Sequence, residues 1–299
     1  MGGKRQADRR RLERRGRWER LGSLRWRLGQ RPTWHVALGR ADWRALDPSR
    51  GIPIPNPPGA YLADPFVCAW RGRTALLAER YDWLTGRGSI AAYNLDGTQA
   101  SLVGDALAEP FHLFFPFTFA HEGTLWMAPE CSEAGGLRLY RCLEFPHRWE
   151  LGHVALEGER LADPLLFAHE GRWWLLANRA DAGGAFSGRL CAWYAGNPLG
   201  GWTEHAANPV VLDRTRGRNG GLLWADGVPH RVGQRQGADV YGRGLGIFRI
   251  DRLTPDDYAE SPVRRIAPDF LPGIRAAHHM SHADGITAWD FSRWGWPGR

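Results

Sequence analysis

The feature of this sequence that most constrains its fold is an internal repeat of about fifty residues. Segments 116–130 (PFTFAHEGTLWMAPE) and 164–178 (PLLFAHEGRWWLLAN) nearly coincide, and segment 65–79 (PFVCAWRGRTALLAE) has the same frame. Two weaker copies occupy 220–234 and 278–292. The copies fill the chain almost to its end, which predicts a structure built from five similar units.

Each copy is typical of a β-hairpin, because an apolar strand runs into a two-residue turn that ends in glycine and a second apolar strand follows. The predicted turns are Arg71-Gly72, Glu122-Gly123, Glu170-Gly171, Asp226-Gly227 and Asp284-Gly285. Further strand-like runs lie between the copies, and 38 Gly with 20 Pro suit a chain that turns often. The pattern predicts an all-β protein, a five-bladed β-propeller formed as one domain by residues 32–299.

Polar residues recur at the ends of these hairpins. If each turn has two residues, strand partners have a constant sum of residue numbers. The predicted pairs are Asp64 with Glu79, Phe115 with Glu130, Asp163 with Asn178, Asn219 with Gln234, and Ala277 with Ser292. The same end of every inner hairpin meets at one mouth of a propeller channel, so a polar ring is expected there. Such a ring either binds a ligand or caps strand ends and holds trapped water.

The carboxylates of this ring suit glycosyl chemistry, in which one carboxylate activates or acts as a nucleophile and a protonated one assists the leaving group. We expect Asp64 to be the base or nucleophile, Glu130 the acid, and Asp163 to orient the sugar, with Glu79 as a further catalytic carboxylate. Crowded carboxylates raise one another's pKa, which would keep one of them protonated.

A basic group surrounds the fourth hairpin. Its members are Arg216, Arg218, His230, Arg231 and Arg235, beside Gln234 and Gln236. Guanidinium groups bind phosphate or carboxylate well, so the group predicts a phosphorylated or lipid-linked sugar, unless it is a solvated basic face. The expected substrate contacts are Arg218, Arg231, Gln234, His278, Asn178 and Asn219.

Metal and cofactor chemistry is not expected. His278 and His282 share a strand face and, with His279, could ligate a metal, but the sequence supplies no fixed carboxylate beside them. Cys68, Cys131, Cys142 and Cys191 form no CxxC pair, so we expect free thiols in a reducing cytoplasm.

The basic charge of the chain is concentrated in residues 1–31, where twelve Lys and Arg face three acidic residues although the whole chain has a formal net charge of +7. The rest of the chain is therefore slightly acidic, and no nucleic-acid partner is expected. An arginine-rich helix with an apolar stripe in this tail would lie on an anionic membrane; RNA binding and disorder are the alternatives. Without a signal peptide or an apolar span, a cytoplasmic protein peripheral to the inner membrane face is predicted.

Several motifs together carry a resemblance to a known family. They are ADPF (63–66), HLFFPFTF (112–119), MAPE (127–130), LYRCLEFPHRWE (139–150), ADPLLF (162–167), GRWWLLAN (171–178), GGWTEHAANPV (200–210), HRVGQRQGADVYG (230–242) and HHMSHADG (278–285). Over roughly residues 33–292 the chain resembles the N-terminal propeller of plant glucosamine inositolphosphorylceramide transferases and its bacterial stand-alone relatives. That family is similar to the five-bladed furanosidase-type propellers, the invertase and arabinanase architecture.

The wider resemblance implies three channel carboxylates, two of which Asp64 and Asp163 match by position and by the proline that follows each. The fourth blade departs from the pattern, since Asn219 and Gln234 stand where the acid is expected. His278, at the fifth-blade position, is implied to line the channel.

We therefore predict a carbohydrate-active enzyme, hydrolytic or transferring, that acts on a sugar in cell-surface glycan or glycolipid metabolism. The alternative is a non-catalytic glycan-binding module that acts with a partner glycosyltransferase.

Overall fold

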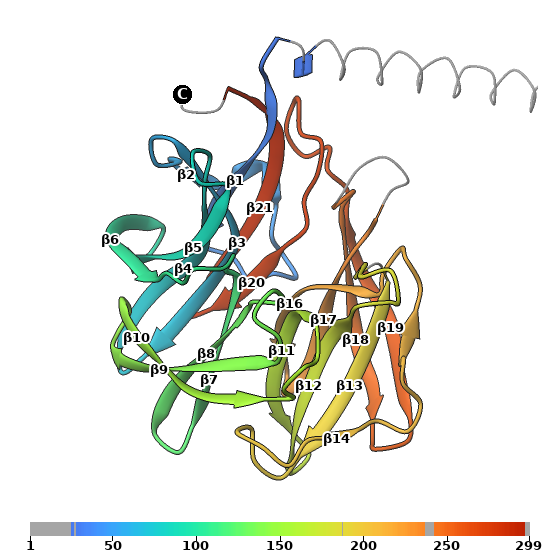
Figure 1. Ribbon diagram of the computed structural model, residues 1–299. Helices are drawn as coiled ribbons and strands as arrows, with labels where there is room; N and C mark the ends of the chain where they lie inside the picture. The colour runs from blue at the N-terminus through green and yellow to red at the C-terminus, as the bar shows by residue number, and fades with distance from the viewer. Residues whose placement is uncertain (1–24, 27, 187, 237–241, 297–299) are drawn as a thin grey trace, which may run out of the picture.

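The computed structural model describes residues 25–26, 28–186, 188–236 and 242–296. They form five antiparallel sheets arranged around a common centre, so the predicted five-bladed β-propeller is confirmed (Figure 1). Beyond the strands, the structure has the short 3-10 helix η1 (Pro48–Arg50).

The first four blades follow one another along the chain, and each is numbered here from its inner strand outward. The first blade consists of β3 (Ala60–Trp70), β4 (Arg73–Asp82), β5 (Arg87–Asp96) and β6 (Gln99–Leu107). The second consists of β7 (Phe114–His121), β8 (Thr124–Glu130), β9 (Leu137–Glu144) and β10 (Arg148–Ala155). The third consists of β11 (Leu161–His169), β12 (Arg172–Arg179), β13 (Arg189–Ala195), β14 (Thr203–Glu204) and β15 (Val211–Leu212). The fourth consists of β16 (Arg218–Ala225), β17 (Val228–Gln234), β18 (Leu245–Leu253) and β19 (Tyr258–Ile266).

The fifth blade is built from two distant parts of the sequence. Its inner strands are β20 (Met280–Ala283) and β21 (Ile286–Gly295), and its outer strands are β1 (Arg31–Gly39) and β2 (Ile52–Ile54). β1 pairs with β21 along its whole length, as the blue and red strands of Figure 1 show. Early and late strands thus close the ring with an antiparallel ladder.

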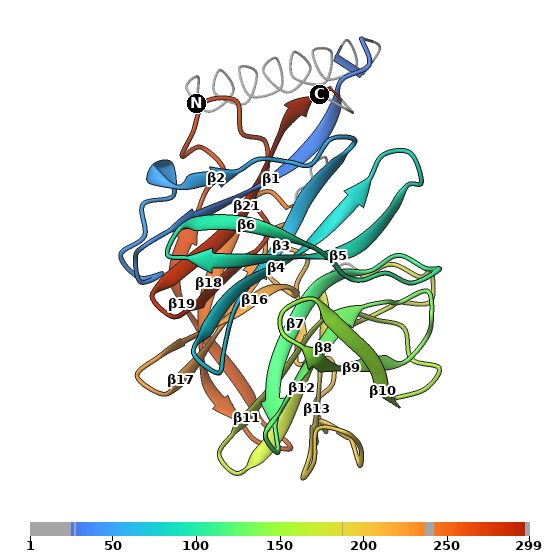
Figure 2. The ribbon, with the colours of Figure 1, turned by 90° about the vertical axis from the view of Figure 1, so that its left-hand side faces the viewer.

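Apolar layers between neighbouring blades hold the ring together. The inner strands contact one another in a closed cycle, β3 to β7, β11, β16, β20 and back to β3 (Figures 1 and 2). Large side chains fill the spaces between blades; Trp174 and Trp193 pack in the third blade, and Trp289 packs between the fourth and fifth. Burial of apolar surface in these layers is a main source of the stabilising free energy.

All five predicted hairpin turns are confirmed. The turn residue before each glycine has a φ between 47° and 52°, and the glycine that follows it has a φ between 70° and 76°. Positive φ at both positions is the geometry of a type I′ turn, which matches the twist of paired strands. These five turns lie at one end of the ring, and the predicted polar residues lie at the other.

The predicted strand pairs are wrong by one residue, in every blade and in the same direction. Glu79 lies opposite Ala63, and Glu130 lies opposite Phe114. The cause is a β-bulge that places one extra residue on the inner strand, so that Asp64 and Pro65 together face a single residue of β4. The other observed pairs are Ala162 with Asn178, Arg218 with Gln234, and Ala276 with Ser292.

The bulges have a distinctive backbone. Asp64, Phe115 and Asp163 have φ values of 46°, 52° and 50°, which for non-glycine residues costs about 1 kcal/mol each. Each of the three precedes a proline, which has no N–H to leave unpaired where the ladder is interrupted.

Three further expectations concern the chain as a whole. All four cysteines are free, as predicted. Among the described residues no helix has the length and apolar character needed to cross a bilayer.

The basic tail is predicted at residues 1–31. Residues 1–24 lie outside the described part of the chain, and Arg31 is the first residue of β1.

The closure of the ring predicts a sharp boundary for N-terminal deletions. Removing residues 1–24 should change the melting temperature little, whereas removing residues 1–39 should prevent cooperative unfolding because β21 loses its partner strand. Thermal unfolding followed by circular dichroism checks both. A stable 40–299 fragment would contradict the closure described here.

Candidate functional site

The first group of site residues joins the first and fifth blades. Asp64 is the bulge residue of β3, Asp290 lies on β21, and His278 lies just before β20. The Nδ1 atom of His278 is 2.6 Å from Asp290 Oδ2 and 3.7 Å from Asp64 Oδ1. Trp34 stacks on the imidazole with ring centroids 3.8 Å apart. Asp64 and His278, both predicted at the channel mouth, are thus close neighbours.

Asp290 also serves the backbone. Its Oδ1 atom accepts hydrogen bonds from the N–H groups of His278 at 3.0 Å and His279 at 2.9 Å, and its Oδ2 atom accepts from the N–H of Asp64 at 3.1 Å. The carboxylate has no exposed surface. It therefore ties the bulge of the first blade to the last blade.

The charges of this group are strongly coupled. Burial favours a neutral imidazole, but the charges of Asp290 and Asp64 outweigh it and raise the pKa of His278 to about 9. Burial also favours a neutral Asp290, yet the His278 charge and hydrogen bonds hold the pKa of that carboxyl below its usual range. Burial raises the pKa of Asp64 well above its usual range, assisted by the charges of Asp290, Glu79 and Asp163. These shifts favour the charged forms of His278 and Asp290 and disfavour the ionised form of Asp64.

The same three side chains are potential metal ligands. One ligand atom from each of Asp64, His278 and Asp290 lies within 4.8 Å of the others. A metal would have to displace the proton from an imidazole whose pKa is raised to about 9. A metal ion would therefore compete with this proton, and its binding here would strengthen as pH rises.

The second group of site residues joins the second, third and fourth blades. The Arg218 guanidinium binds Asp163 with Nε 2.6 Å from Oδ2, and its Nη2 lies 3.9 Å from Glu130 Oε2. The same Glu130 oxygen accepts the backbone N–H of Asp163 at 2.9 Å. Burial, followed by the charge of Asp163, raises the pKa of Glu130 well above its usual range, although Arg218 opposes the shift.

The two groups lie at the same end of the ring and act on each other electrostatically. The charge of Asp163 raises the pKa values of both Asp64 and His278. We call the combined set the acid cluster: Asp64, Glu130, Asp163 and Asp290 with the cations Arg218 and His278.

The three predicted amide residues are used by the backbone. Asn178 Oδ1 accepts the N–H of Asn219 at 3.0 Å, and Asn219 Nδ2 donates to the carbonyl oxygens of Asp163 and Leu176. Gln234 Nε2 donates to the Asn219 carbonyl at 2.6 Å. All three amides are buried. Their arrangement corresponds to the strand-capping alternative rather than to substrate contact.

Arg231, expected to contact substrate, is completely buried. Its Nε and Nη2 atoms form a bidentate ion pair with Glu260 at 2.8 Å and 2.7 Å, and Arg216 binds the same carboxylate at 3.1 Å. Tyr258 donates a further hydrogen bond to Glu260. Of the predicted basic group, Arg218 is therefore the member that reaches the acid cluster, and its guanidinium already binds Asp163.

Glu79 lies near the acid cluster with a partner that the sequence did not suggest. His112 Nε2 lies 3.1 Å from Glu79 Oε1, and His112 Nδ1 accepts the backbone N–H of Gly88 at 3.3 Å. The charge of Glu79 contributes to the raised pKa of Asp64.

Aromatic rings pack near the bulges of three blades. Phe66 contacts Phe115 and His279 with centroid distances of 5.0 Å and 4.4 Å, and Phe115 lies 5.3 Å from His279. His279 is fully buried, and burial lowers its pKa to about 3. The rings of Phe66, Phe115 and His279 thus form apolar surroundings beside the bulge residues of the acid cluster.

Sequence reasoning missed Asp290, Trp34, His112 and Glu260. Asp290 had a detectable signal, because the matching position of the other four copies holds an apolar residue. Those residues are Leu77, Ala128, Leu176 and Val232. Only Asp290 breaks this core-facing pattern. Trp34, His112 and Glu260 lie outside the repeated hairpins and had no such signal.

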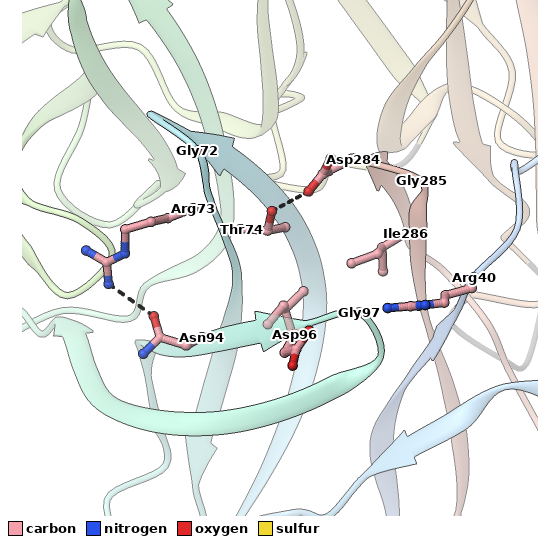
Figure 3. Close-up of a pocket in the computed structure, with 11 residues that line it drawn as sticks. Arg40, Gly72, Arg73, Thr74, Asn94, Asp96, Gly97, Asp284, Gly285 and Ile286 are labelled. Carbon is pink, nitrogen blue, oxygen red and sulfur yellow. Dashed lines mark hydrogen bonds between the residues drawn. The ribbon is translucent and has the colours of Figure 1, made fainter.

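The opposite end of the ring has a groove of about 660 Å³ between the first and fifth blades. Gly72 and Gly285 of two hairpin turns line it, together with Arg40 and Asp96 (Figure 3). Its location at the turn end separates it from the acid cluster, and we do not assign the site to it.

The fold is that of a five-bladed β-propeller of the arabinanase type. The catalytic domain of a GH62 α-L-arabinofuranosidase from Coprinopsis cinerea matches with a TM-score of 0.57 at 11% identity, covering 89% of this chain and 97% of that one. Sucrose-6-phosphate hydrolase from Lactobacillus gasseri matches with a TM-score of 0.57 at 17% identity, covering 77% and 53%. At these identities the likeness shows the fold alone.

The chain belongs to the family described as glucosamine inositolphosphorylceramide transferase 1, N-terminal, whose family model matches residues 52–277. Proteins named glucosamine inositolphosphorylceramide transferase 1 are 35% identical to it, over 244 residues in Oryza sativa subsp. japonica and over 211 residues in Arabidopsis thaliana. The aligned regions cover 80% and 69% of this chain but 32% and 28% of those proteins. The predicted resemblance is confirmed, and the chain spans about a third of the length of these relatives.

The His278 ion pair predicts a pH dependence of stability. Its folded pKa of about 9 exceeds the ordinary value of 6.5, so the ion pair stabilises the fold fully below pH 6.5 and loses that contribution as pH rises through 9. Imidazole NMR of the wild-type protein should show one histidine titrating near 9, absent in His278→Gln. Urea unfolding should show a stability loss between pH 6.5 and 9 that is smaller in the variant. A His278 resonance that titrates below 6.5 would contradict the assignment.

Proposed function

We propose that the acid cluster binds a sugar residue and acts on its glycosidic bond. The observation that carries the proposal is the pair of buried carboxyl groups, Asp64 and Glu130, whose pKa values are raised beside Asp163. A carboxyl that keeps its proton near neutral pH can assist a leaving group, and a neighbouring carboxylate can activate a nucleophile.

The roles follow from these environments. Glu130 gives its proton to the leaving oxygen as the bond from that oxygen to the anomeric carbon breaks. Asp64 must first release its own proton to solvent; its carboxylate then takes the proton from an incoming water or sugar hydroxyl, whose oxygen forms the new bond. Asp163, fixed by Arg218, accepts hydrogen bonds from sugar hydroxyls. Water as acceptor gives hydrolysis, and a hydroxyl gives transfer.

The charge balance of the site favours a ligand class. Five carboxyl groups, counting Glu79, lie near only two cations, and burial together with neighbouring negative charges raises the pKa values of Asp64 and Glu130. An ammonium group on the sugar would relieve this deficit. The plant relatives are named for glucosamine, which carries such a group, and for a ceramide lipid. We therefore propose an amino sugar, carried on a glycolipid, as the ligand.

A non-catalytic role is the second candidate. Glu130 caps the backbone of the next blade, and the chain covers only about a third of its plant relatives. Both observations fit a recognition module that positions a glycan for a partner glycosyltransferase.

Amide substitutions distinguish these functions. Asp64→Asn and Glu130→Gln should each leave the free energy of unfolding unchanged or increased at pH 7, because they remove a carboxyl whose ionisation burial disfavours. Turnover of glucosamine-containing glycolipids should fall at least about 100-fold, while ligand affinity changes little. The exposed Glu157→Gln is the matched control and should change neither quantity. Affinity that falls without any detectable turnover supports the recognition module, and lowered stability with no ligand effect contradicts both functions.

We also propose that the basic residues 1–31 hold the propeller on the inner face of an anionic membrane. Deleting residues 1–24 should reduce sedimentation with phosphatidylserine vesicles, because each basic residue near such a surface contributes about 1 kcal/mol. Neutral phosphatidylcholine vesicles are the control. Equal binding of both proteins to anionic vesicles would contradict the membrane role.

A further inference from the structure

A group of partly exposed aromatic side chains lies beside the acid cluster, at the end of the first blade. Tyr61 and Tyr81 are cross-strand partners on β3 and β4 and stack with centroids 4.8 Å apart at 14°. Trp83 stands across both rings, with centroid distances of 5.3 Å and 5.4 Å. We call Tyr61, Tyr81 and Trp83 the aromatic patch. Such flat amphipathic rings pack against the apolar faces of sugar rings.

The patch has a rigid support. Asp82 Oδ1 accepts the backbone N–H groups of Leu84 and Thr85 at 2.9 Å and 2.8 Å, which fixes the turn that follows Trp83. The backbone N–H of Trp83 donates to the Gly59 carbonyl at 2.9 Å. A ligand therefore meets rings that are already held in place, which reduces the entropy lost on binding.

A fixed hydrogen-bond acceptor adjoins the patch. Because His112 Nδ1 accepts the N–H of Gly88, its Nε2 atom carries the proton and donates to Glu79 Oε1. Gly88 is required for this approach, since a Cβ there would lie 3.0 Å from both Glu79 Oε1 and His112 Nε2. The described residues provide no partner for the second Glu79 oxygen. That oxygen can accept a hydrogen bond from a ligand.

The patch, the acceptor and the acid cluster are contiguous. Glu79 and Tyr81 are two residues apart on β4, so their side chains share one face of the strand. The His112 ring lies 5.9 Å from Tyr81 and contacts Glu79, which joins the two features. Glu79 lies opposite Ala63, the residue before Asp64.

From this arrangement we propose a second sugar-binding subsite, in which a pyranose ring packs on the aromatic patch and donates a hydroxyl hydrogen bond to Glu79. The inference rests on the proposed function, because this ring belongs to the same saccharide as the ring at the acid cluster. In this subsite Glu79 binds the sugar and His112 positions Glu79, so neither residue is assigned a catalytic role. The ligand class becomes a saccharide of at least two rings.

The test compares one-ring and two-ring probes by isothermal titration calorimetry. Glucosamine is titrated into the wild-type protein, followed by glucosamine-containing disaccharides of different linkages. The best disaccharide should bind about tenfold more tightly than the monosaccharide, the difference that 1.4 kcal/mol of added contact produces. Trp83→Ala and Tyr81→Ala should each remove most of this gain and leave monosaccharide affinity within about twofold. Glu79→Gln should also remove most of the gain.

Two controls and two outcomes make the test decisive. Trp83→Phe should keep part of the gain, and Trp224→Ala, an exposed tryptophan near the turn end of the fourth blade, should keep all of it. Monosaccharide binding without a disaccharide gain, or a gain that all three variants retain, overturns the subsite while leaving the proposed function in place. Failure of every protein to bind any of these sugars contradicts the proposed function and the subsite together.

Discussion

The extra residue on the inner strand of each blade leaves a backbone N–H without a ladder partner at the acid end of the ring. A buried N–H must find an acceptor. Glu130, Asn178 and Asp290 supply it, each reaching from one blade to the bulge of the next, at Asp163, Asn219 and Asp64 respectively. Much of the polar ring is therefore explained by the backbone itself. Asp64 and Asp163 are different, because within the described part of the chain neither carboxylate accepts a hydrogen bond from the backbone of another blade.

This division gives the acid cluster its electrostatic character. The side chains that accept the bulge N–H groups are one amide, Asn178, and two carboxyl groups, Glu130 and Asp290. These two carboxyl groups lie next to those of the bulge residues Asp163 and Asp64. Arg218 and His278 balance part of the negative charge, and burial with the neighbouring charges raises the pKa values of Asp64 and Glu130. A buried site in which carboxyl groups outnumber cations is suited both to proton transfer and to a cationic ligand. Its stability and its chemistry therefore have one physical origin.

The repeat predicted the blades, the five turns and the end of the ring at which polar residues gather, because each depends on local patterns. The strand register could not be predicted from the turns alone, since a bulge lies between each turn and the polar end. The proline that follows Asp64, Phe115 and Asp163 was the sequence signal of three of these bulges. Arg231 was misplaced because its partner Glu260 lies on β19, outside the repeated hairpin. Asp290 was recognisable only as a charge at an apolar position.

The central claim is that the acid cluster is a sugar site, and a crystal structure of Asp64→Asn soaked with a glucosamine-containing disaccharide tests it most directly. The account predicts one ring within hydrogen-bond distance of Glu130 and Asp163 and a second ring against Tyr81 and Trp83. A sugar bound only in the groove at the opposite end of the ring (Figure 3) would contradict the account.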